Sequence, residues 1–379
     1  MMKISVSRPE INLDDYRSIK KIFDNKWLIN GPNVQAFEKK FKKKFNYKFC
    51  SAVSSCTSGL ELVLNTLNLK KNDEVILSSF NFIAAGIAIK KNKAIPVFVD
   101  QKENSFDVDL EDIKKKINLN TKAILLTHFN GYLQNSIAIR NLIKKTKRKI
   151  FFIEDCAHVL AAKHKKNIYS GFYSDAAVFS FGPTKMITCG GMGGMVVSKN
   201  NDLIKKINIL KSFGMNRSSI NRENTDKNWK YNIKSIGANF RMTEIQAAIG
   251  LEQLKRVNYF KKKKYQISKF YIKNLDKKHL SFQSSNYTYD SALIYFQIIF
   301  KRNRLRDLTA NYLKKNNIGI SVHWDPPLDN HYIFKTKKFC KNSHNLSKKI
   351  LSLPFYPSLK RSDQIKIINL INTYLKVEK

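Results

Sequence analysis

The sequence is poor in acidic residues and in cysteine, and it contains no long apolar segment. Only 29 of its 379 residues are Asp or Glu. No stretch approaches the roughly 18 consecutive apolar residues of a membrane-spanning helix, so no membrane association is expected. The five cysteines lie far apart and include no Cys-x-x-Cys pair, which favours free thiols over a disulfide framework or a metal site.

The N-terminal segment and the length of the chain indicate its cellular location and the number of its domains. Met1 to Pro9 lacks the apolar segment of a secretory signal, and together with the free thiols this predicts a cytoplasmic protein. A chain of 379 residues is long enough for one large domain and a smaller one, each with its own core.

The scarcity of acidic residues leaves a formal net charge of +40. A basic surface attracts polyanions such as nucleic acids. However, the sequence contains no zinc finger and no RNP-type aromatic signature, and its lysines are spread along the whole chain. A genome rich in A/T codons would give the same composition, so nucleic-acid binding is not expected. The lysine-rich runs at 39–44 and 261–264 are interpreted as solvated helix faces.

Short apolar runs alternate with helix-like segments between about residues 50 and 200. The runs are rich in β-branched and aromatic residues and show little polar alternation, as in a parallel sheet covered on both faces. The expected strands are Val75–Ser79, Ala94–Val99, Ala123–Thr127, Ile150–Asp155, Ala176–Phe181 and Met195–Ser198. The predicted fold class is α/β, with a mostly parallel central sheet flanked by helices.

The pattern changes after Thr243. The sequence Thr243-Glu244-Ile245-Gln246 has the spacing of a capping box and predicts the start of a long helix. A strand is expected within 287–300, and a closing helix over 362–375. We predict a large domain over residues 1–255, including the N-terminal segment, and a smaller α+β domain over 256–379.

The strongest chemical signal is Lys185, which ends the segment Phe179-Ser180-Phe181-Gly182-Pro183-Thr184-Lys185 and precedes a glycine-rich stretch at 190–194. A lysine that forms a Schiff base must be held by rigid elements and desolvated, so that its pKa falls. The alternative is a surface lysine in a loop. The choice between a Schiff-base lysine and a surface lysine depends on the other motifs of the sequence.

A second motif contains Asp155 and His158. Asp155 stands at the carboxyl end of an expected buried strand, where α/β proteins bind ligands. Its carboxylate could pair with a protonated pyridine nitrogen, and His158 could donate a hydrogen bond to a ring oxygen. The alternatives are an ordinary strand-end aspartate and a structural histidine.

A third motif, Ser54-Ser55-Cys56-Thr57-Ser58-Gly59, leads into an expected helix. Backbone N–H groups and hydroxyls at a helix N-terminus can bind a phosphate. Simple N-capping is the alternative. The segment is not a Walker loop, because it lacks the GxxxxGK[ST] spacing.

In their order along the chain, the three motifs resemble the DegT/DnrJ/EryC1/StrS family of fold-type-I sugar aminotransferases. The resemblance covers nearly the whole chain. Its further landmarks are Trp27–Pro32, Ser79–Ala84, Pro96–Asp100, Gly237–Met242, His323 and Leu351–Pro354.

The resemblance implies a transferase that depends on pyridoxal 5′-phosphate, with Lys185 forming the Schiff base and Asp155 pairing with the ring nitrogen. The other implied cofactor contacts are Phe82 and His158 at the ring, Thr57, Ser58 and Ser180 at the phosphate, and Asn239 from the neighbouring subunit. The implied substrate-side residues are Trp27, Asn30 and His323. The active sites would therefore be shared within a homodimer.

The implied reaction moves an amino group from an amino acid, glutamate by family analogy, to a nucleotide-linked keto-deoxysugar, in the biosynthesis of polysaccharide or glycoconjugate precursors. The sequence departs from the family at Gly190–Gly194, which is one residue longer than usual and lacks the acid, and at Cys56 and Ser58. Two other functions stay open. A sugar dehydratase of the same family would carry a histidine in place of Lys185, and a non-catalytic polyanion-binding regulator would use the +40 charge.

Overall fold

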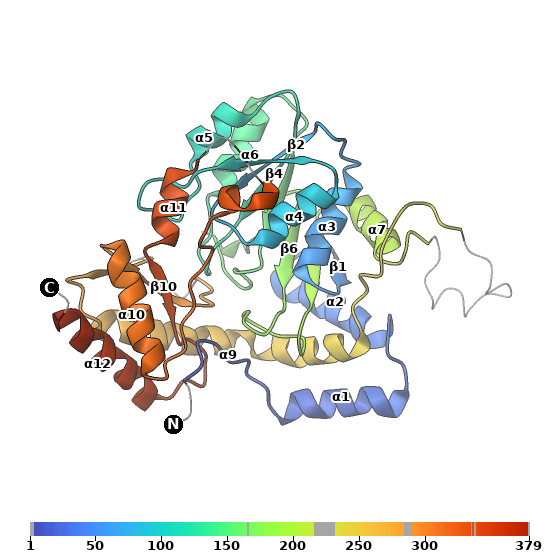
Figure 1. Ribbon diagram of the computed structural model, residues 1–379. Coiled ribbons are helices and arrows are strands. Elements are labelled where there is room, and N and C mark those ends of the chain that lie inside the picture. Colours follow the sequence, from blue (N-terminus) through green and yellow to red (C-terminus); the bar gives the residue numbers. More distant parts are fainter. Residues whose placement is uncertain are drawn as a thin grey trace.

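The computed structural model describes residues 4–164, 167–215, 232–283, 288, 290–334, 336 and 339–377 and contains a large and a small sheet (Figure 1). The large sheet has the strand order β1-β7-β6-β5-β4-β2-β3. Its strands are β1 (Phe49–Val53), β2 (Glu74–Ser78), β3 (Ile95–Val99), β4 (Thr121–Thr127), β5 (Phe151–Asp155), β6 (Ala176–Ser180) and β7 (Gly194–Ser198). The strands β6, β5, β4, β2 and β3 are parallel to one another. The expected α/β fold with a mostly parallel sheet is confirmed.

The direction of β7 differs from the expected pattern. This strand pairs antiparallel with both β1 and β6. All five of its residues are buried, so its sequence has the same continuous apolar run as a parallel strand. Hydrophobicity alone therefore could not reveal its direction.

Helices cover both faces of the large sheet (Figure 1). They are α2 (Pro32–Phe45), α3 (Cys56–Thr66), α4 (Ile83–Lys91), α5 (Leu110–Lys116), α6 (Ser136–Lys145), α7 (Asn201–Leu210) and α9 (Glu244–Asn274), whereas α1 (Leu13–Asn25) packs on α9. Apolar residues of α2 and α9 share one core cluster with Phe179 of β6, whereas α3, α4 and α7 share another with Val178. These two neighbouring strand residues point to opposite faces, as the pleat of a strand requires.

The C-terminal part packs around the second half of α9. It contains β8 (Leu280–Phe282), β9 (Phe296–Phe300), β10 (Ile350–Leu353), α10 (Asn303–Lys315), α11 (Lys341–Ser347), α12 (Arg361–Val377) and the short 3₁₀ helices η2 (Leu328–Asn330) and η3 (Tyr332–Phe334). The three strands form the order β10-β9-β8, all antiparallel. The strand expected within 287–300 is shorter, and residues 287 and 289 lie outside the described part of the chain.

The predicted domain boundary falls inside α9. This helix starts at the expected capping box, where Thr243 Oγ1 accepts from the N–H of Gln246 at 3.1 Å. Leu254 and Val257 still belong to the core of the large sheet, whereas Ile267 and Tyr271 belong to the core of the small one. Division at residue 255 stays a prediction, since α9 continues through it without a break.

The C-terminal part also bonds back to the carboxyl ends of β2 and β3. Ser79 Oγ donates to Asp329 Oδ1 at 2.5 Å, and Asp100 Oδ1 accepts from the N–H of Ser343 at 2.8 Å. These bonds hold the segment from His323 to α11 beside the edge of the sheet at which the parallel strands end.

One interpretation of the lysine runs is wrong. Lys261 and Lys264, in the run read as a solvated face, are buried. Lys264 Nζ donates to the carbonyl oxygen of Ile294 at 3.2 Å, and burial lowers the pKa of Lys264 to about 7. Lys261 Nζ likewise donates to the carbonyl oxygen of Ala161, at 2.8 Å. Both lysines are thus buried by contacts of α9 with distant parts of the chain, which a local charge pattern does not reveal.

Within the described ranges, no helix has both the length and the apolar character that a membrane span needs.

Candidate active site

A cavity of about 690 Å³ opens at the carboxyl edge of the large sheet. Its walls are the N-terminus of α3, the segments that follow β2, β5 and β6, and the C-terminal segment around His323. Seven of the eleven residues predicted for the site line it: Thr57, Phe82, Asp155, His158, Ser180, Lys185 and His323. Residues that are up to 266 positions apart in the sequence (57 to 323) thus share one cavity.

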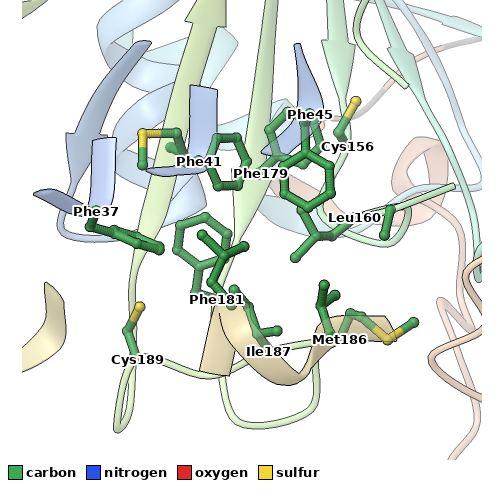
Figure 2. Packing of buried hydrophobic residues seen from close by; sticks show 14 of the residues in the cluster. Phe37, Phe41, Phe45, Cys156, Leu160, Phe179, Phe181, Met186, Ile187 and Cys189 are labelled. Atoms are coloured by element: carbon green, nitrogen blue, oxygen red, sulfur yellow. The ribbon is translucent and has the colours of Figure 1, made fainter. Parts of the chain in front are cut away.

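The residues that follow Lys185 are buried in the hydrophobic core and fix its position. The chain leaves β6 at Ser180 and turns, with the N–H of Lys185 donating to the carbonyl oxygen of Gly182 at 3.1 Å. The next two side chains, Met186 and Ile187, are buried in the cluster that contains Phe181 (Figure 2). Burial lowers the pKa of Lys185, although nearby Cys56 and Asp155 oppose the shift. A rigid, desolvated amine of this kind is what a Schiff-base lysine requires.

Asp155 is a buried carboxylate with one oxygen still available. Its Oδ1 accepts from the N–H of Ala157 at 3.0 Å and lies 3.8 Å from Cys56 Sγ. Among the described residues, Oδ2 has no hydrogen-bond partner. Burial raises the pKa of Asp155, against the opposing effects of Ala157 N–H and Lys185. A cationic partner in the cavity would therefore favour the ionised carboxylate.

His158 stands in an aromatic wall and is neutral. Its Nδ1 accepts from the N–H of Asn130 at 3.4 Å, so the neutral ring carries its hydrogen on Nε2, which can donate. Its ring stacks on that of Trp324, with centroids 5.7 Å apart and an interplanar angle of 27°. Burial, followed by the charge of Lys185, lowers the pKa of His158 well below its ordinary range.

His323 belongs to the same wall. Its ring centroid lies 4.2 Å from that of Tyr295, and its Nδ1 lies 3.0 Å from Ser352 Oγ. Burial and Lys185 lower the pKa of His323 to about 3. Both histidines are therefore uncharged hydrogen-bonding groups at neutral pH.

The N-terminus of α3 offers free donors to the cavity. Ser55 caps the helix by accepting from the N–H of Ser58 at 3.1 Å, which leaves the N–H groups of Cys56 and Thr57 without acceptors among the described residues. The hydroxyls of Thr57 and Ser180 are likewise without a described partner. Three unpaired donors at a helix N-terminus, together with the hydroxyl of Ser180 at the end of β6, are suited to an anion.

Two glycines allow this turn to approach the sheet. A Cβ on Gly59 would lie 2.6 Å from Val178 Cγ1, and one on Gly194 would lie 2.5 Å from the carbonyl carbon of Ser55. Either distance is shorter than real Cβ contacts, so larger residues would push α3 away from β6 and β7.

Four predicted residues lie outside the cavity lining. The hydroxyl of Ser58 is engaged in the capping box and donates to the carbonyl oxygen of Ser55 at 2.8 Å. Asn239 is exposed, and its Oδ1 accepts from Arg241 Nε at 2.9 Å. Trp27 donates to the carbonyl oxygen of Ile29 at 2.8 Å, and Asn30 occupies a left-handed backbone conformation with φ of 52°. The predicted roles of these four stay predictions.

Sequence reasoning missed three residues of the cavity wall. Tyr295 Oη lies 3.3 Å from Thr184 Oγ1, Trp324 stacks on His158, and Asn81 Nδ2 donates to Thr127 Oγ1 at 2.8 Å. Asn81 and Trp324 are direct neighbours of the predicted Phe82 and His323, and that adjacency was an available signal. Tyr295 gave none, because it precedes a strand in an otherwise apolar stretch.

A desolvated lysine and a buried carboxylate that share a cavity with a phosphate-type helix N-terminus define a pyridoxal-phosphate-dependent enzyme of the α/β class. The model of the DegT/DnrJ/EryC1/StrS aminotransferase family matches residues 9–372, and the chain belongs to this family. It is accordingly a transaminase of the sugar aminotransferase type that uses pyridoxal 5′-phosphate.

Similar proteins are found in distant organisms. The chain is 32% identical to the spore coat polysaccharide biosynthesis protein SpsC of Bacillus subtilis, over 98% of this chain and 96% of that protein. It is 31% identical to the GDP-perosamine synthase of Escherichia coli O157:H7, over 99% of both chains. Its fold matches the aminotransferase TlmJ of Streptoalloteichus hindustanus with a TM-score of 0.91 at 24% identity, over the full length of both chains.

The residues of the cavity fit this cofactor. Asp155 Oδ2 is a buried acceptor that lacks a described partner, and a protonated ring nitrogen would supply one. The unpaired donors around Thr57 and Ser180 are those that a phosphate group needs. Within the described ranges, no group of three or more His, Cys, Asp or Glu side chains could hold a metal ion.

Proposed function

We propose that this chain transfers an amino group from glutamate to a nucleotide-linked keto-deoxysugar, for the biosynthesis of a polysaccharide or glycoconjugate precursor. The observation that carries the chemistry is the shared cavity of Lys185 and Asp155. The substrate class rests on the family and on the similarity to a GDP-perosamine synthase and a polysaccharide biosynthesis protein.

In this proposal, Lys185 and Asp155 divide the chemistry between them. Pyridoxal phosphate, when bound, supplies an aldehyde that condenses with amines and a ring that takes up the electron pair of the neighbouring carbon. Lys185 Nζ, which is neutral in a larger fraction of molecules than an exposed lysine, acts as the nucleophile and moves a proton between carbon atoms. Asp155 Oδ2 holds the proton of the ring nitrogen and so favours the electron-accepting form of the ring.

Other cavity residues orient the groups that react. With the cofactor bound, His158 Nε2 would donate to its ring oxygen and Phe82 would contact its ring. Thr57, Ser180 and the N–H groups at the start of α3 hold the phosphate. The hydroxyl of Ser58 takes part in the capping box that shapes this cradle. Trp27, Asn30 and His323 serve the substrate side.

We further propose a homodimer in which Asn239 reaches the partner subunit's phosphate site. Phe82 and Met192 line the cavity, yet they are 54% and 60% exposed, so the chain itself leaves this side open. Phe213, close to Asn239 through the backbone bridge of Ser212, is also exposed. A second copy that covers these apolar side chains would complete the site.

The five cysteines are free and buried, which supports a cytoplasmic enzyme, because reduced thiols persist in that compartment. Nucleotide-linked sugars as substrates agree with the same location.

The test is a two-stage assay with purified enzyme loaded with pyridoxal phosphate. Glutamate alone should give one equivalent of 2-oxoglutarate per site. Adding a panel of nucleoside-diphosphate 3-keto- and 4-keto-6-deoxyhexoses should then allow multiple turnovers and yield an amino-sugar detectable by mass spectrometry. Lys185→Ala is the control for the first stage.

Each other outcome selects a different function. A sugar product that has lost a hydroxyl but gained no nitrogen would identify the dehydratase. No 2-oxoglutarate with any amino acid, combined with tight binding to heparin, would identify the polyanion-binding regulator.

A further inference from the structure

A second and larger cavity, of about 950 Å³, lies at the opposite edge of the large sheet. Lys122 near the start of β4, Phe151 at the start of β5 and Asp175 just before β6 line it. The other ends of β5 and β6 carry Asp155 and Ser180 of the first cavity. Since β5 has five residues, the two cavities are about 13 Å apart along this strand. Nothing in the transamination proposed above uses the second cavity.

The second cavity concentrates part of the +40 charge. Its lining cations are Lys122, Arg140, Lys144, Arg148, Lys149 and Lys199, against only two carboxylates. Asp73 already pairs with Lys122 at 3.7 Å, and Asp175 pairs with Arg140 at 3.0 Å. The four remaining cations have no carboxylate within ion-pairing distance in the described part of the chain.

Lys199 lies against an aromatic ring and has no carboxylate within ion-pairing distance among the described residues. Its Nζ lies 3.5 Å from the ring centroid of Phe172. Burial lowers the pKa of Lys199, and the neighbouring cations Arg140 and Lys48 lower it further, whereas Glu154 and Asp175 oppose the shift. A multivalent anion between these cations would remove the repulsion.

The wall of the second cavity is apolar and partly aromatic. Phe151 and Tyr173 are half-buried, and Leu203 and Ile150 complete this side. An inorganic anion would leave such a wall in contact with water, whereas a planar base could pack against it.

We propose that the second cavity binds a nucleoside di- or triphosphate. The phosphates lie among Lys144, Arg148, Lys149 and Lys199, and the base packs against the wall formed by Phe151 and Tyr173. The volume of about 950 Å³ is at the upper end of ordinary small-molecule sites and accommodates a nucleotide. Nucleotide binding at this site gives part of the positive net charge of the chain a function.

The test measures ATP binding to the pyridoxal-phosphate-loaded enzyme by equilibrium dialysis. Arg148→Glu combined with Lys149→Glu should weaken ATP binding on the order of tenfold or more, because two cations at the phosphates become anions. The matched control is Lys39→Glu combined with Lys43→Glu on α2, which changes the net charge equally at two exposed positions. Both double variants should release 2-oxoglutarate from glutamate at the wild-type rate. Equal ATP affinity in the two double variants would overturn the proposal.

A second pair of measurements tests the nucleoside part. Tyr173→Ala should weaken ATP binding severalfold and leave the binding of inorganic triphosphate unchanged. If inorganic triphosphate binds to the wild-type enzyme as tightly as ATP does, the base makes no contribution and the assignment to a nucleotide is wrong. These measurements need no sugar substrate, so their outcome is independent of the proposed transamination.

Discussion

Cys56 Sγ lies 3.8 Å from Asp155 Oδ1, close enough for a thiol to donate a hydrogen bond. Burial, and after it the charge of Asp155, raises the pKa of Cys56 well above its ordinary value, so the group stays a thiol. The N–H of Ala157 donates to the same oxygen at 3.0 Å. The two donors orient the carboxylate, and Oδ2 has no hydrogen-bond partner among the described residues.

Replacing Cys56 should therefore change the titration of Asp155. The thiol hydrogen bond lowers the pKa of Asp155, so Cys56→Ala should raise it. A carboxylate with a higher pKa ionises only at higher pH, and the acid limb of the pH profile of kcat should move to higher pH. Cys56→Ser keeps a donor and should retain the wild-type profile. An unchanged acid limb in Cys56→Ala would show that the thiol has no such effect.

Asp155→Asn should keep the cofactor and lose most of the activity. An amide cannot hold the proton of the ring nitrogen, while the phosphate donors at α3 are untouched. A hydrogen bond to a charged group contributes about 1.5–3 kcal/mol, so kcat should fall on the order of ten- to a hundredfold. Cofactor content is measured by absorbance and turnover by 2-oxoglutarate release. Near wild-type turnover would remove Asp155 from the catalytic residues.

Lys185 should be the lysine that pyridoxal phosphate modifies at neutral pH. Because burial lowers the pKa of Lys185, more of it is neutral at pH 7 than of a lysine with the ordinary pKa. Reduction with borohydride at limiting cofactor, followed by peptide mass spectrometry, should find the label on Lys185. The selectivity should fall towards pH 10, where exposed lysines lose their protons too. Lys185→Ala should abolish both labelling and turnover, and a label that moves to another lysine with retained turnover would refute the assignment.

Shared active sites predict rescue in mixed dimers. Lys185→Ala and Asn239→Ala subunits, each poorly active alone, should recover part of the activity after subunit exchange, because one site of the mixed dimer keeps both residues. The contribution of Asn239 to the phosphate is about 1.5–3 kcal/mol, so the assay is run at limiting pyridoxal phosphate. Exchange is verified by mass. No recovery after confirmed exchange would mean that Asn239 acts within its own chain or not at all.

Burial of Lys264 should make stability depend on pH. Its pKa is lowered to about 7 in the folded protein, whereas an unfolded lysine titrates near 10.4, so the unfolded state binds more protons between these values. The free energy of unfolding therefore rises with pH across this window, by on the order of 2 kcal/mol from pH 7.5 to 9.5. Lys264→Met should lose the share of the rise that comes from Lys264, whereas the exposed control Lys39→Met should keep it. Urea unfolding at the two pH values measures the difference, and the same slope in both variants would contradict it.

The local patterns of the sequence predicted most of the elements. The apolar runs at 75–79, 123–127 and 150–155 are strands, and the capping box at Thr243 starts α9 as expected. These features depend on periodicity and on hydrogen bonds between residues three or four positions apart, which a sequence displays directly. The roles of Asp155, which ends such a run, and of Lys185, which lies four residues after the run at 176–181, were also inferred at this level, and they stay predictions.

The contacts between elements that are distant in the sequence were decided only by the tertiary structure. The antiparallel direction of β7, the burial of Lys264 and the contact of Cys56 with Asp155, 99 residues away, follow from how strands and helices pair across the molecule. The hydroxyl of Ser58 donates to the carbonyl oxygen of Ser55 within the local capping box, and its predicted contact with the phosphate stays a prediction. A single sequence lists the side chains that could react, whereas long-range packing determines which of them face the same cavity.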